Sequence, residues 1–177
     1  MGISFSFYGE IMIDNATKAV SLLIQANKTV SFAESCTGGM ACARLVDVPD
    51  ASKVLNASFV TYANEAKMQL LGVKKETLAR FGAVSEETAR EMAEGICRAN
   101  KAAVGIAISG IAGPGGGTEE KPVGTVCFGF CIDGTTRTVT RRFGNLGRQK
   151  VREAAVDFVF DTLCKLLEKD NISLLKI

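Results

Sequence analysis

Side chains that could do chemistry gather in one short stretch of the chain, Glu34-Ser35-Cys36-Thr37-Gly38-Gly39. The apolar run from Thr29 to Ala33 before it is typical of a buried strand, and Met40 to Val46 after it predicts the start of a helix. In open α/β sheets, ligands bind at such turns, beyond the carboxyl ends of the strands. The glycines would let the backbone approach a ligand, and the helix N-terminus would offer free N–H groups to an anion. The alternative is an ordinary loop whose Ser and Thr cap the helix.

The sequence contains no histidine. This excludes Ser-His-Asp and Cys-His catalytic arrangements, and it removes the commonest zinc ligand. A hydroxyl nucleophile would therefore need a lysine, a carboxylate or a tyrosine as its base. Lys67 is a candidate because it is expected on the first turn of a helix that follows a strand, where the helix N-terminus disfavours a positive charge. The alternative is a solvated lysine on an amphipathic helix.

A third polar loop follows the run from Ala102 to Ser109, which is apolar enough for a strand buried on both faces. The chain then enters Gly110–Gly117, which is too rich in glycine for a regular element, and the loop continues to residue 122. If the first three strands are parallel, the loops at 34–39, 62–67 and 109–122 share one edge of the sheet. We expect these three loops to converge there.

The whole chain predicts an α/β fold. Helices are expected at 11–26, 40–46, 65–71, 74–81, 86–100 and 148–168, and strands at 29–33, 57–62, 102–109, 124–132 and 135–143. Asn64 and Ser85 are expected helix N-caps. The order predicts a three-layer α/β/α domain with a mixed, mostly parallel sheet and a C-terminal antiparallel hairpin that turns at Asp133-Gly134. Residues 11–177 are expected to form this single domain, and residues 1–10 a loosely ordered lead-in.

Composition narrows the class of protein. The 177 residues are 47% hydrophobic and carry a formal net charge of +2, so charge alone implies no nucleic-acid partner. No apolar run is long enough to span a bilayer, and the N-terminus does not resemble a secretory signal. The six cysteines include no C-x-x-C pair, which favours reduced thiols and a cytoplasmic location. No metal or cofactor is expected, and we expect a homo-oligomer.

Several longer motifs then carry a family resemblance. They are Ala33-Glu34-Ser35-Cys36-Thr37-Gly38-Gly39, Val60-Thr61-Tyr62-Ala63-Asn64-Glu65-Ala66-Lys67, Gly82-Ala83-Val84-Ser85, Ser109-Gly110-Ile111-Ala112-Gly113-Pro114 and Lys121-Pro122-Val123-Gly124, with Arg148 later in the chain. In order and approximate spacing, the chain resembles the CinA carboxy-terminal domain family over roughly residues 11–167. Active members of that family are nicotinamide-nucleotide amidohydrolases (NMN deamidases). The length resembles that of the stand-alone form.

The resemblance implies hydrolysis of nicotinamide mononucleotide to nicotinate mononucleotide and ammonia, without metal or organic cofactor. It places the nucleophile on Ser35 and the base on Lys67. Ser109 would relay the proton or hold the lysine, and either Ser109 or Tyr62 would orient the lysine by hydrogen bonding. Arg148 would meet the phosphate of the nucleotide. The remaining expected substrate-binding residues are Thr37, Gly38, Gly39, Gly110 and Gly113, with backbone N–H groups of Thr37 to Gly39 holding the oxyanion.

The chain departs from the family pattern at two places. Asn56-Ala57-Ser58 stands where a glycine-rich pair is usual, and Leu146-Gly147 precedes the late arginine where Gly-Asp or Gly-Asn is usual. The second departure leaves Arg142 and Arg152 as alternatives to Arg148 for the phosphate. Two other functions stay open: a catalytically weak nucleotide-binding or interaction module, and a thiol enzyme that uses Cys36. The thiol-enzyme alternative is disfavoured, because the Cys36 side chain is expected to point away from the site and pack in the interior.

Overall fold

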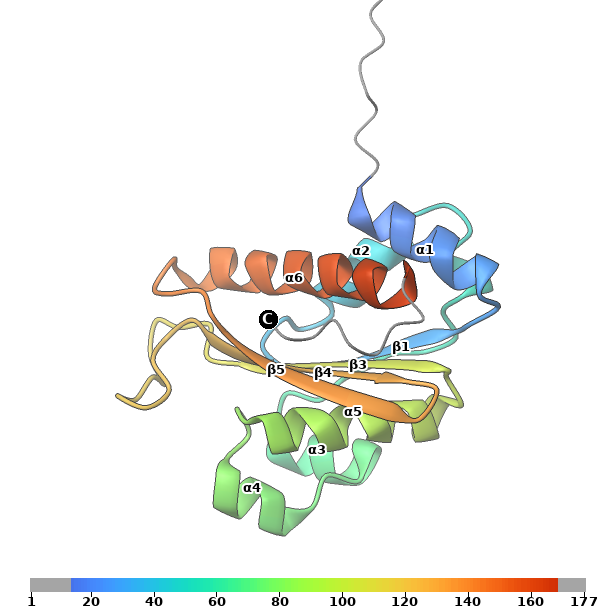
Figure 1. Cartoon of the computed structure of the whole chain (residues 1–177). Helices are drawn as coiled ribbons and strands as arrows, with labels where there is room; N and C mark the ends of the chain where they lie inside the picture. The colour runs from blue at the N-terminus through green and yellow to red at the C-terminus, as the bar shows by residue number, and fades with distance from the viewer. Residues whose placement is uncertain (1–13, 169–177) are drawn as a thin grey trace, which may run out of the picture.

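The computed structural model describes residues 14–168 and shows an alternation of helices and strands along the chain (Figure 1). Residues 1–10, the expected lead-in, and the first three residues of the expected helix at 11–26 lie outside the described residues. The elements are α1 (Asn15–Gln25), β1 (Val30–Glu34), α2 (Met40–Val46), the short 3₁₀-helix η1 (Ala51–Lys53), β2 (Phe59–Val60), α3 (Asn64–Leu71), α4 (Lys75–Phe81), α5 (Glu86–Asn100), β3 (Val104–Gly110), β4 (Thr125–Ile132), β5 (Thr135–Arg142) and α6 (Arg148–Glu168).

The described residues form one five-stranded sheet in the order β2-β1-β3-β4-β5. β1 pairs parallel with β2 and β3, with Glu34 opposite both Val60 and Ile108. β4 pairs antiparallel with β3 and with β5. Only β4 therefore runs against the other strands of this sheet. The mixed sheet, its largely common strand direction and the C-terminal hairpin are confirmed.

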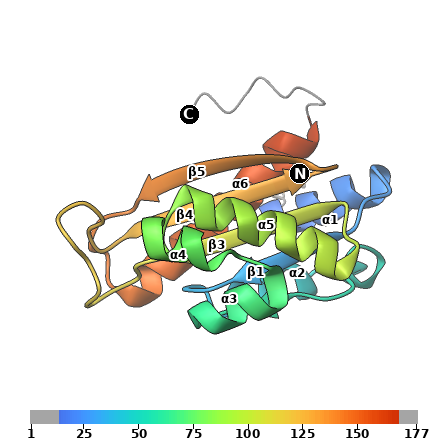
Figure 2. The same ribbon diagram turned by 90° about the horizontal axis from the view of Figure 1, so that it is seen from below.

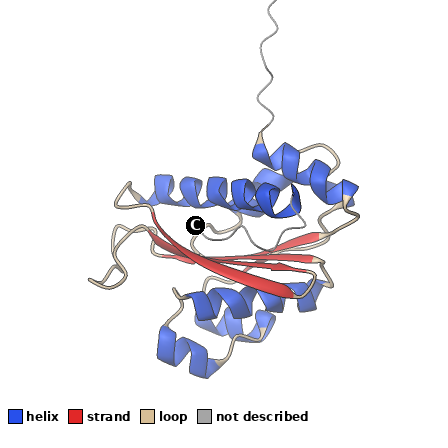
Figure 3. Ribbon diagram, in the orientation of Figure 1, coloured by secondary structure: helices blue, strands red, loops and turns tan. Residues whose placement is uncertain are grey.

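Helices cover both faces of the sheet, as expected for three layers. α1, α2 and α6 lie on one face, and α3, α4 and α5 lie on the other (Figures 1 and 2). The colouring by secondary structure shows the sheet as a single layer between them (Figure 3). The described helices include none long and apolar enough to cross a membrane.

Alternating side chains of the central strands supply a core on each face. Phe32 of β1 packs with Phe160 of α6, their ring centroids 6.2 Å apart, while its neighbour Ala33 joins the core under α5. Each fully buried large apolar side chain stabilises the fold by about 1.5–3 kcal/mol. Gly105 lets α5 lie close to the sheet, because a Cβ there would come within 2.4 Å of the Ala93 carbonyl oxygen. The alternation sets which face each site residue occupies: Glu34 faces α2 and α6, and Ser35 faces α3 and α5.

Two local expectations were wrong. β2 is two residues long instead of 57–62, because the Phe32 N–H takes the Ser58 hydroxyl as acceptor, at 3.0 Å, in place of a ladder carbonyl. Asn64 is the first residue of α3 and not its cap; Ala63 holds the cap position, with no side-chain hydrogen bond. Ser85 does cap α5, accepting from the Thr88 N–H at 3.2 Å, as expected.

Candidate active site

The loops after β1, β2 and β3 meet at one edge of the sheet. Backbone hydrogen bonds continue past the strand ends: the Ser35 N–H donates to the Ile108 carbonyl at 2.9 Å, and the Thr61 N–H donates to the Glu34 carbonyl at 2.8 Å. These two bonds hold the starts of the three loops side by side. The convergence predicted from the polar and glycine residues of these loops is confirmed.

Ser35 and Lys67 contact each other at this edge. Lys67 Nζ lies 3.0 Å from Ser35 Oγ, and Lys67 is 0% exposed. Nζ also donates to the carbonyl oxygens of Thr61, at 2.7 Å, and of Tyr62, at 3.2 Å. A neutral amine has two N–H groups and one lone pair. Because carbonyl oxygens only accept, they take both N–H groups and leave the lone pair for the Ser35 hydroxyl proton.

Burial lowers the pKa of Lys67, because the charged form loses its hydration; the nearby Cys36 acts in the opposite direction as the smaller of the two causes. The ion pairs among the described residues do not involve Lys67. The two carbonyls carry only partial charge, so no carboxylate in this part of the chain holds the lysine in its ammonium form. The site therefore favours a neutral amine next to a hydroxyl, which is the requirement for a lysine base.

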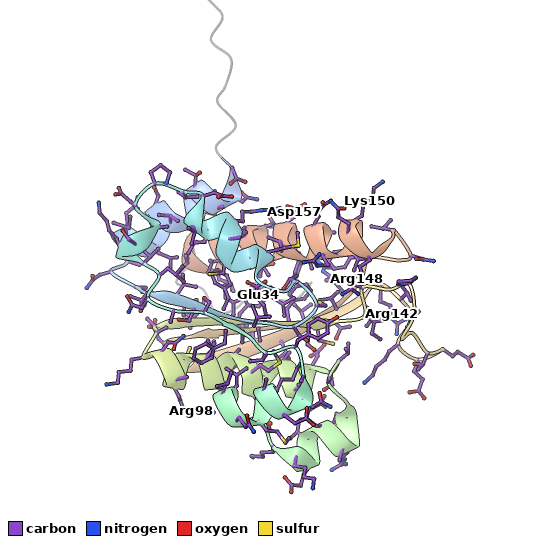
Figure 4. The ribbon with its side chains drawn as sticks, turned by 180° about the vertical axis from the view of Figure 1, so that it is seen from behind. Glu34, Arg98, Arg142, Arg148, Lys150 and Asp157 are labelled. Atoms are coloured by element: carbon purple, nitrogen blue, oxygen red, sulfur yellow. The ribbon has the colours of Figure 1, made fainter. Side chains whose placement is uncertain are left out.

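Glu34 fills the N-terminus of α2. The residue is 1% exposed, and its carboxylate accepts from the N–H groups of Gly39 at 3.0 Å, Ala41 at 3.1 Å and Cys42 at 2.8 Å. Figure 4 shows Glu34 between the sheet and the helices on this face. The expectation that this helix N-terminus offers free N–H groups to an anion is therefore wrong, since the chain supplies its own anion.

The expectation that the N–H groups of Thr37 to Gly39 hold the oxyanion changes for the same reason. The Gly39 N–H is bound by Glu34, and the Gly38 N–H donates to the Ser35 carbonyl oxygen at 3.1 Å. Both groups are occupied within the chain, so their assignment as oxyanion donors is wrong. Within residues 14–168, the Thr37 N–H has no acceptor, and its buried hydroxyl has no partner either. That the Thr37 N–H holds the oxyanion remains a prediction.

Arg148, Tyr62 and Gly113 join two of the loops to the start of α6. Arg148 Nη2 donates to the Tyr62 hydroxyl at 3.0 Å, and Nη1 donates to the Gly113 carbonyl at 3.0 Å. Tyr62 thus orients Lys67 through its backbone carbonyl, while its hydroxyl meets the arginine. Tyr62 is 62% exposed, so the Tyr62–Arg148 pair forms an outer rim of the site that a ligand can reach.

Ser109 lies on the same face as Ser35, but its hydroxyl turns to another partner. It donates to the Ala83 carbonyl oxygen at 2.7 Å, and among the described residues it has no hydrogen bond with Lys67. Its part in proton transfer remains a prediction. Gly110 has a packing reason to be glycine, since a Cβ there would lie 2.7 Å from a methyl group of Val126.

The other two late arginines differ in where they point. Arg152 Nε donates to the Cys36 carbonyl at 3.0 Å, and its Nη2 donates to the Thr37 carbonyl at 2.8 Å. Arg142 instead donates to the Glu120 carbonyl at 3.3 Å. Arg148 and Arg142 lie at the same end of the molecule (Figure 4). The sequence offered Arg152 only as an alternative phosphate ligand and gave no structural role to Glu34; the contacts of both with the serine loop were not predicted.

Cys36 is a poor candidate for a nucleophile. It is 6% exposed and packs in the apolar core on the α6 side, as expected. Burial raises the pKa of its thiol to about 11, which disfavours the reactive thiolate. All six cysteines are free thiols, and no cluster of three or more metal-binding side chains occurs among the described residues.

A cavity of about 480 Å³ opens beside this edge, one strand beyond Ser109. Its lining residues include Cys127 and Thr125 of β4, the N-terminal residues of α5, and arginine, lysine and glutamate residues. The Ala83 carbonyl, which binds the Ser109 hydroxyl, belongs to the loop next to the cavity. The mixture of charges selects no particular ligand, and the cavity is separate from the Ser35–Lys67 pair.

Comparison with known proteins identifies one family. Residues 13–167 match the CinA C-terminal domain. A putative competence-damage inducible protein of Clostridium perfringens is 53% identical over 164 residues, covering 93% of this chain and 40% of that protein. A CinA-like protein of Petrotoga mobilis is 47% identical over 148 residues, covering 84% of this chain and 36% of that protein. The chain thus spans about two fifths of the length of the curated relatives it matches.

Solved structures match over nearly their whole length. A CinA superfamily protein from Klebsiella pneumoniae aligns with a TM-score of 0.84 at 38% identity, covering 87% of this chain and 96% of that one. A competence/damage inducible protein from Agrobacterium tumefaciens aligns with a TM-score of 0.83, also at 38% identity, covering 94% of this chain and all of that one. The α/β/α fold is therefore the fold of these proteins.

Proposed function

Because the chain belongs to the CinA C-terminal domain family, we propose that it is an amidohydrolase that converts nicotinamide mononucleotide to nicotinate mononucleotide and ammonia. Ser35 is the nucleophile and Lys67 is the general base. The observation that carries this proposal is the 3.0 Å contact between Lys67 Nζ and Ser35 Oγ. A lysine that is buried, has no ion pair within residues 14–168 and points at a hydroxyl is not explained by packing, because burying it costs free energy.

Acylation begins with the transfer of the Ser35 proton to the neutral amine of Lys67. The Oγ attacks the carboxamide carbon, and the carbonyl oxygen becomes the oxyanion of a tetrahedral intermediate. Lys67, now an ammonium, returns the proton to the amide nitrogen as the C–N bond breaks. Ammonia leaves, and a nicotinoyl ester remains on Ser35.

Deacylation uses the same lysine, which is neutral again after ammonia leaves. It takes a proton from a water molecule, and the hydroxide attacks the ester carbon. Collapse of the second tetrahedral intermediate breaks the bond to Oγ, and Lys67 returns the proton to Ser35. The product is nicotinate mononucleotide, and the chain regains its starting state. A single base thus serves both half-reactions.

The phosphate of the nucleotide would meet Arg148 at the rim. Two N–H groups of its guanidinium bind Gly113 and Tyr62, and the remaining ones are available for phosphate oxygens. These two contacts restrict the side chain before substrate arrives, which lowers the entropy lost on binding. Arg148 is exposed, so the phosphate can reach it from solvent.

The test is to incubate the purified protein with nicotinamide mononucleotide, assay ammonia and identify the product by mass spectrometry. Release of ammonia with a product heavier by one mass unit is the expected result, since an amide becomes an acid. Ser35→Ala and Lys67→Ala should abolish it. Binding of the nucleotide without turnover by the unmutated protein would contradict the proposal and favour a nucleotide-binding module. The expected homo-oligomer stays a prediction, to be measured by light scattering on the same preparation.

A further inference from the structure

Arg152 holds the loop that carries Ser35. It comes from the second turn of α6 and binds two successive carbonyls, those of Cys36 at 3.0 Å and Thr37 at 2.8 Å. Cys36 and Arg152 are 116 residues apart along the chain. Hydrogen bonds from a charged donor are about twice as strong as neutral ones, so this is a firm attachment between α6 and the loop.

The attachment decides where the Thr37 N–H points. In a trans peptide unit, the N–H and the C=O point in opposite directions. Because Arg152 draws the Cys36 carbonyl toward α6, the Thr37 N–H of the same unit points away from α6. The Ser35 hydroxyl contacts Lys67 of α3, and α3 and α6 cover opposite faces of the sheet (Figure 1). The Thr37 N–H therefore points toward the side on which Ser35 reacts.

The same N–H is an available donor of the loop, as is that of Cys36, which also has no backbone acceptor within residues 14–168. Gly38 and Gly39 use their N–H groups within the chain, whereas Thr37 finds no acceptor for its N–H in residues 14–168. A buried N–H without an acceptor is uncommon, because leaving it unpaired costs free energy. An oxygen that develops negative charge next to Ser35 would supply the missing acceptor.

We propose that Arg152 is a positioning residue that aims the Thr37 N–H at the oxyanion formed when Ser35 attacks its substrate. The guanidinium also polarises the peptide unit it binds, which makes the N–H a stronger donor. The inference rests on the proposed function for the identity of the substrate, but not for the direction of this N–H. It also separates Arg152 from Arg148: Arg152 acts on the reaction rate, and Arg148 acts on binding of the phosphate.

The experiment measures how fast a fluorophosphonate probe labels Ser35. In this reaction the Oγ–P bond forms, fluoride leaves, Lys67 takes the proton, and a phosphoryl oxygen occupies the oxyanion position. The probe has no nucleotide, so a phosphate-binding role of Arg152 does not affect its rate. Labelling is followed by intact mass in the unmutated protein, Arg152→Gln, Arg152→Lys and the control Asp157→Asn. Asp157 also lies on α6 and binds Arg44 of α2, so its loss loosens α6 without touching the two carbonyls.

Arg152→Gln should slow labelling at least tenfold, since loss of one oxyanion donor costs about 10²–10³ in kcat. Arg152→Lys, which can restore one of the two contacts, should label at an intermediate rate. Asp157→Asn should label like the unmutated protein. With nicotinamide mononucleotide, Arg152→Gln should lower kcat by a similar factor and change KM by less than about twofold. If circular dichroism shows that Arg152→Gln is unfolded, the labelling rate of Arg152→Lys tests the inference instead.

Unchanged labelling in Arg152→Lys and Arg152→Gln, together with a raised KM, would overturn the inference and make Arg152 a phosphate ligand. Equal slowing in Asp157→Asn would also overturn it, because simple docking of α6 would then explain the effect. The proposed function fails separately if the unmutated protein is labelled at Ser35 but releases no ammonia from nicotinamide mononucleotide. Slower labelling of the arginine variants would still support the role of Arg152 in that case.

Discussion

The amine of Lys67 lies closer to the Thr61 carbonyl oxygen, at 2.7 Å, than to the Ser35 hydroxyl oxygen, at 3.0 Å. Thr61 is itself held by β1, since its N–H donates to the Glu34 carbonyl at 2.8 Å. The lysine is therefore placed by backbone groups and does not depend on the serine for its position. Removing the Ser35 hydroxyl should leave the lysine buried and the fold intact.

Loss of either member of the pair should abolish turnover without additive effects. Ser35→Ala, Lys67→Ala and the double variant should show the same residual rate, because the two residues act as one unit. Lys67→Arg should also fail, since a guanidinium does not give up its proton near neutral pH. Steady-state ammonia release checks all four variants. Near-normal turnover by Lys67→Arg would contradict the mechanism, because the site would then need a positive charge and not a free amine.

The pH dependence of turnover should report the lowered pKa of Lys67. The reactive form is the neutral amine, so kcat/KM should rise with pH through the pKa of the buried lysine and then level off. The midpoint of the rise should lie below about 10.4, the pKa of a free lysine side chain. Measurements from pH 5 to pH 10 on the unmutated protein check this, with rates corrected for reversible unfolding. A rate that falls as the pH rises over this range would be incompatible with a lysine base.

The same lysine should make stability depend on pH. Its folded-state pKa is lowered, so between that value and about 10.4 the unfolded chain binds a proton that the folded chain does not. The free energy of unfolding should therefore increase with pH across this window. As the pH falls through the window this contribution is lost, because the buried amine must then carry a charge. Urea unfolding at several pH values checks this: the free energy of unfolding of the unmutated protein should rise relative to that of Lys67→Met as the pH increases through the window.

Glu34→Gln should destabilise the protein. The carboxylate accepts from three N–H groups at the start of α2, and an amide would turn its own N–H₂ toward some of them. The loss should be about 1–3 kcal/mol in the free energy of unfolding, the cost of leaving a buried polar group unsatisfied. Glu65→Gln is a matched control, since Glu65 is an exposed acidic residue in the first turn of α3. Equal urea midpoints for both variants would show that the Glu34 contacts contribute little.

Arg148→Ala should weaken substrate binding by about 1.5–3 kcal/mol, the value of one lost charge-assisted contact. The effect should appear in KM, with a smaller change in kcat. Tyr62→Phe removes the hydroxyl that orients Arg148 but keeps the arginine, so it should raise KM less. Kinetics of both variants with nicotinamide mononucleotide check this. If KM is unchanged in Arg148→Ala, the phosphate lies elsewhere, with Arg142 the next residue to replace.

Sequence alone determined the elements and the edge on which the site lies. Apolar runs marked β1 and β3, because strands covered by helices on both faces bury consecutive residues, and helical spacing of apolar residues marked α6. The absence of histidine directed attention to a lysine base, and the loop that follows β2 contained Lys67. These conclusions were accessible because each depends on residue type and local order. The 57–62 strand was the exception, since the Ser58 hydroxyl replaces a backbone partner there.

Only the tertiary structure decided which polar groups are free to act. Glu34 and Arg152 flank the serine loop from two sides, one filling the N-terminus of α2 and the other holding two carbonyls from α6. The Ser109 hydroxyl likewise turned to Ala83, and Tyr62 offered Lys67 its carbonyl instead of its hydroxyl. Local sequence cannot settle such choices, because each donor selects an acceptor from a segment distant in the chain. Backbone N–H groups are also present at every residue but proline, so only the folded chain shows which of them has no partner.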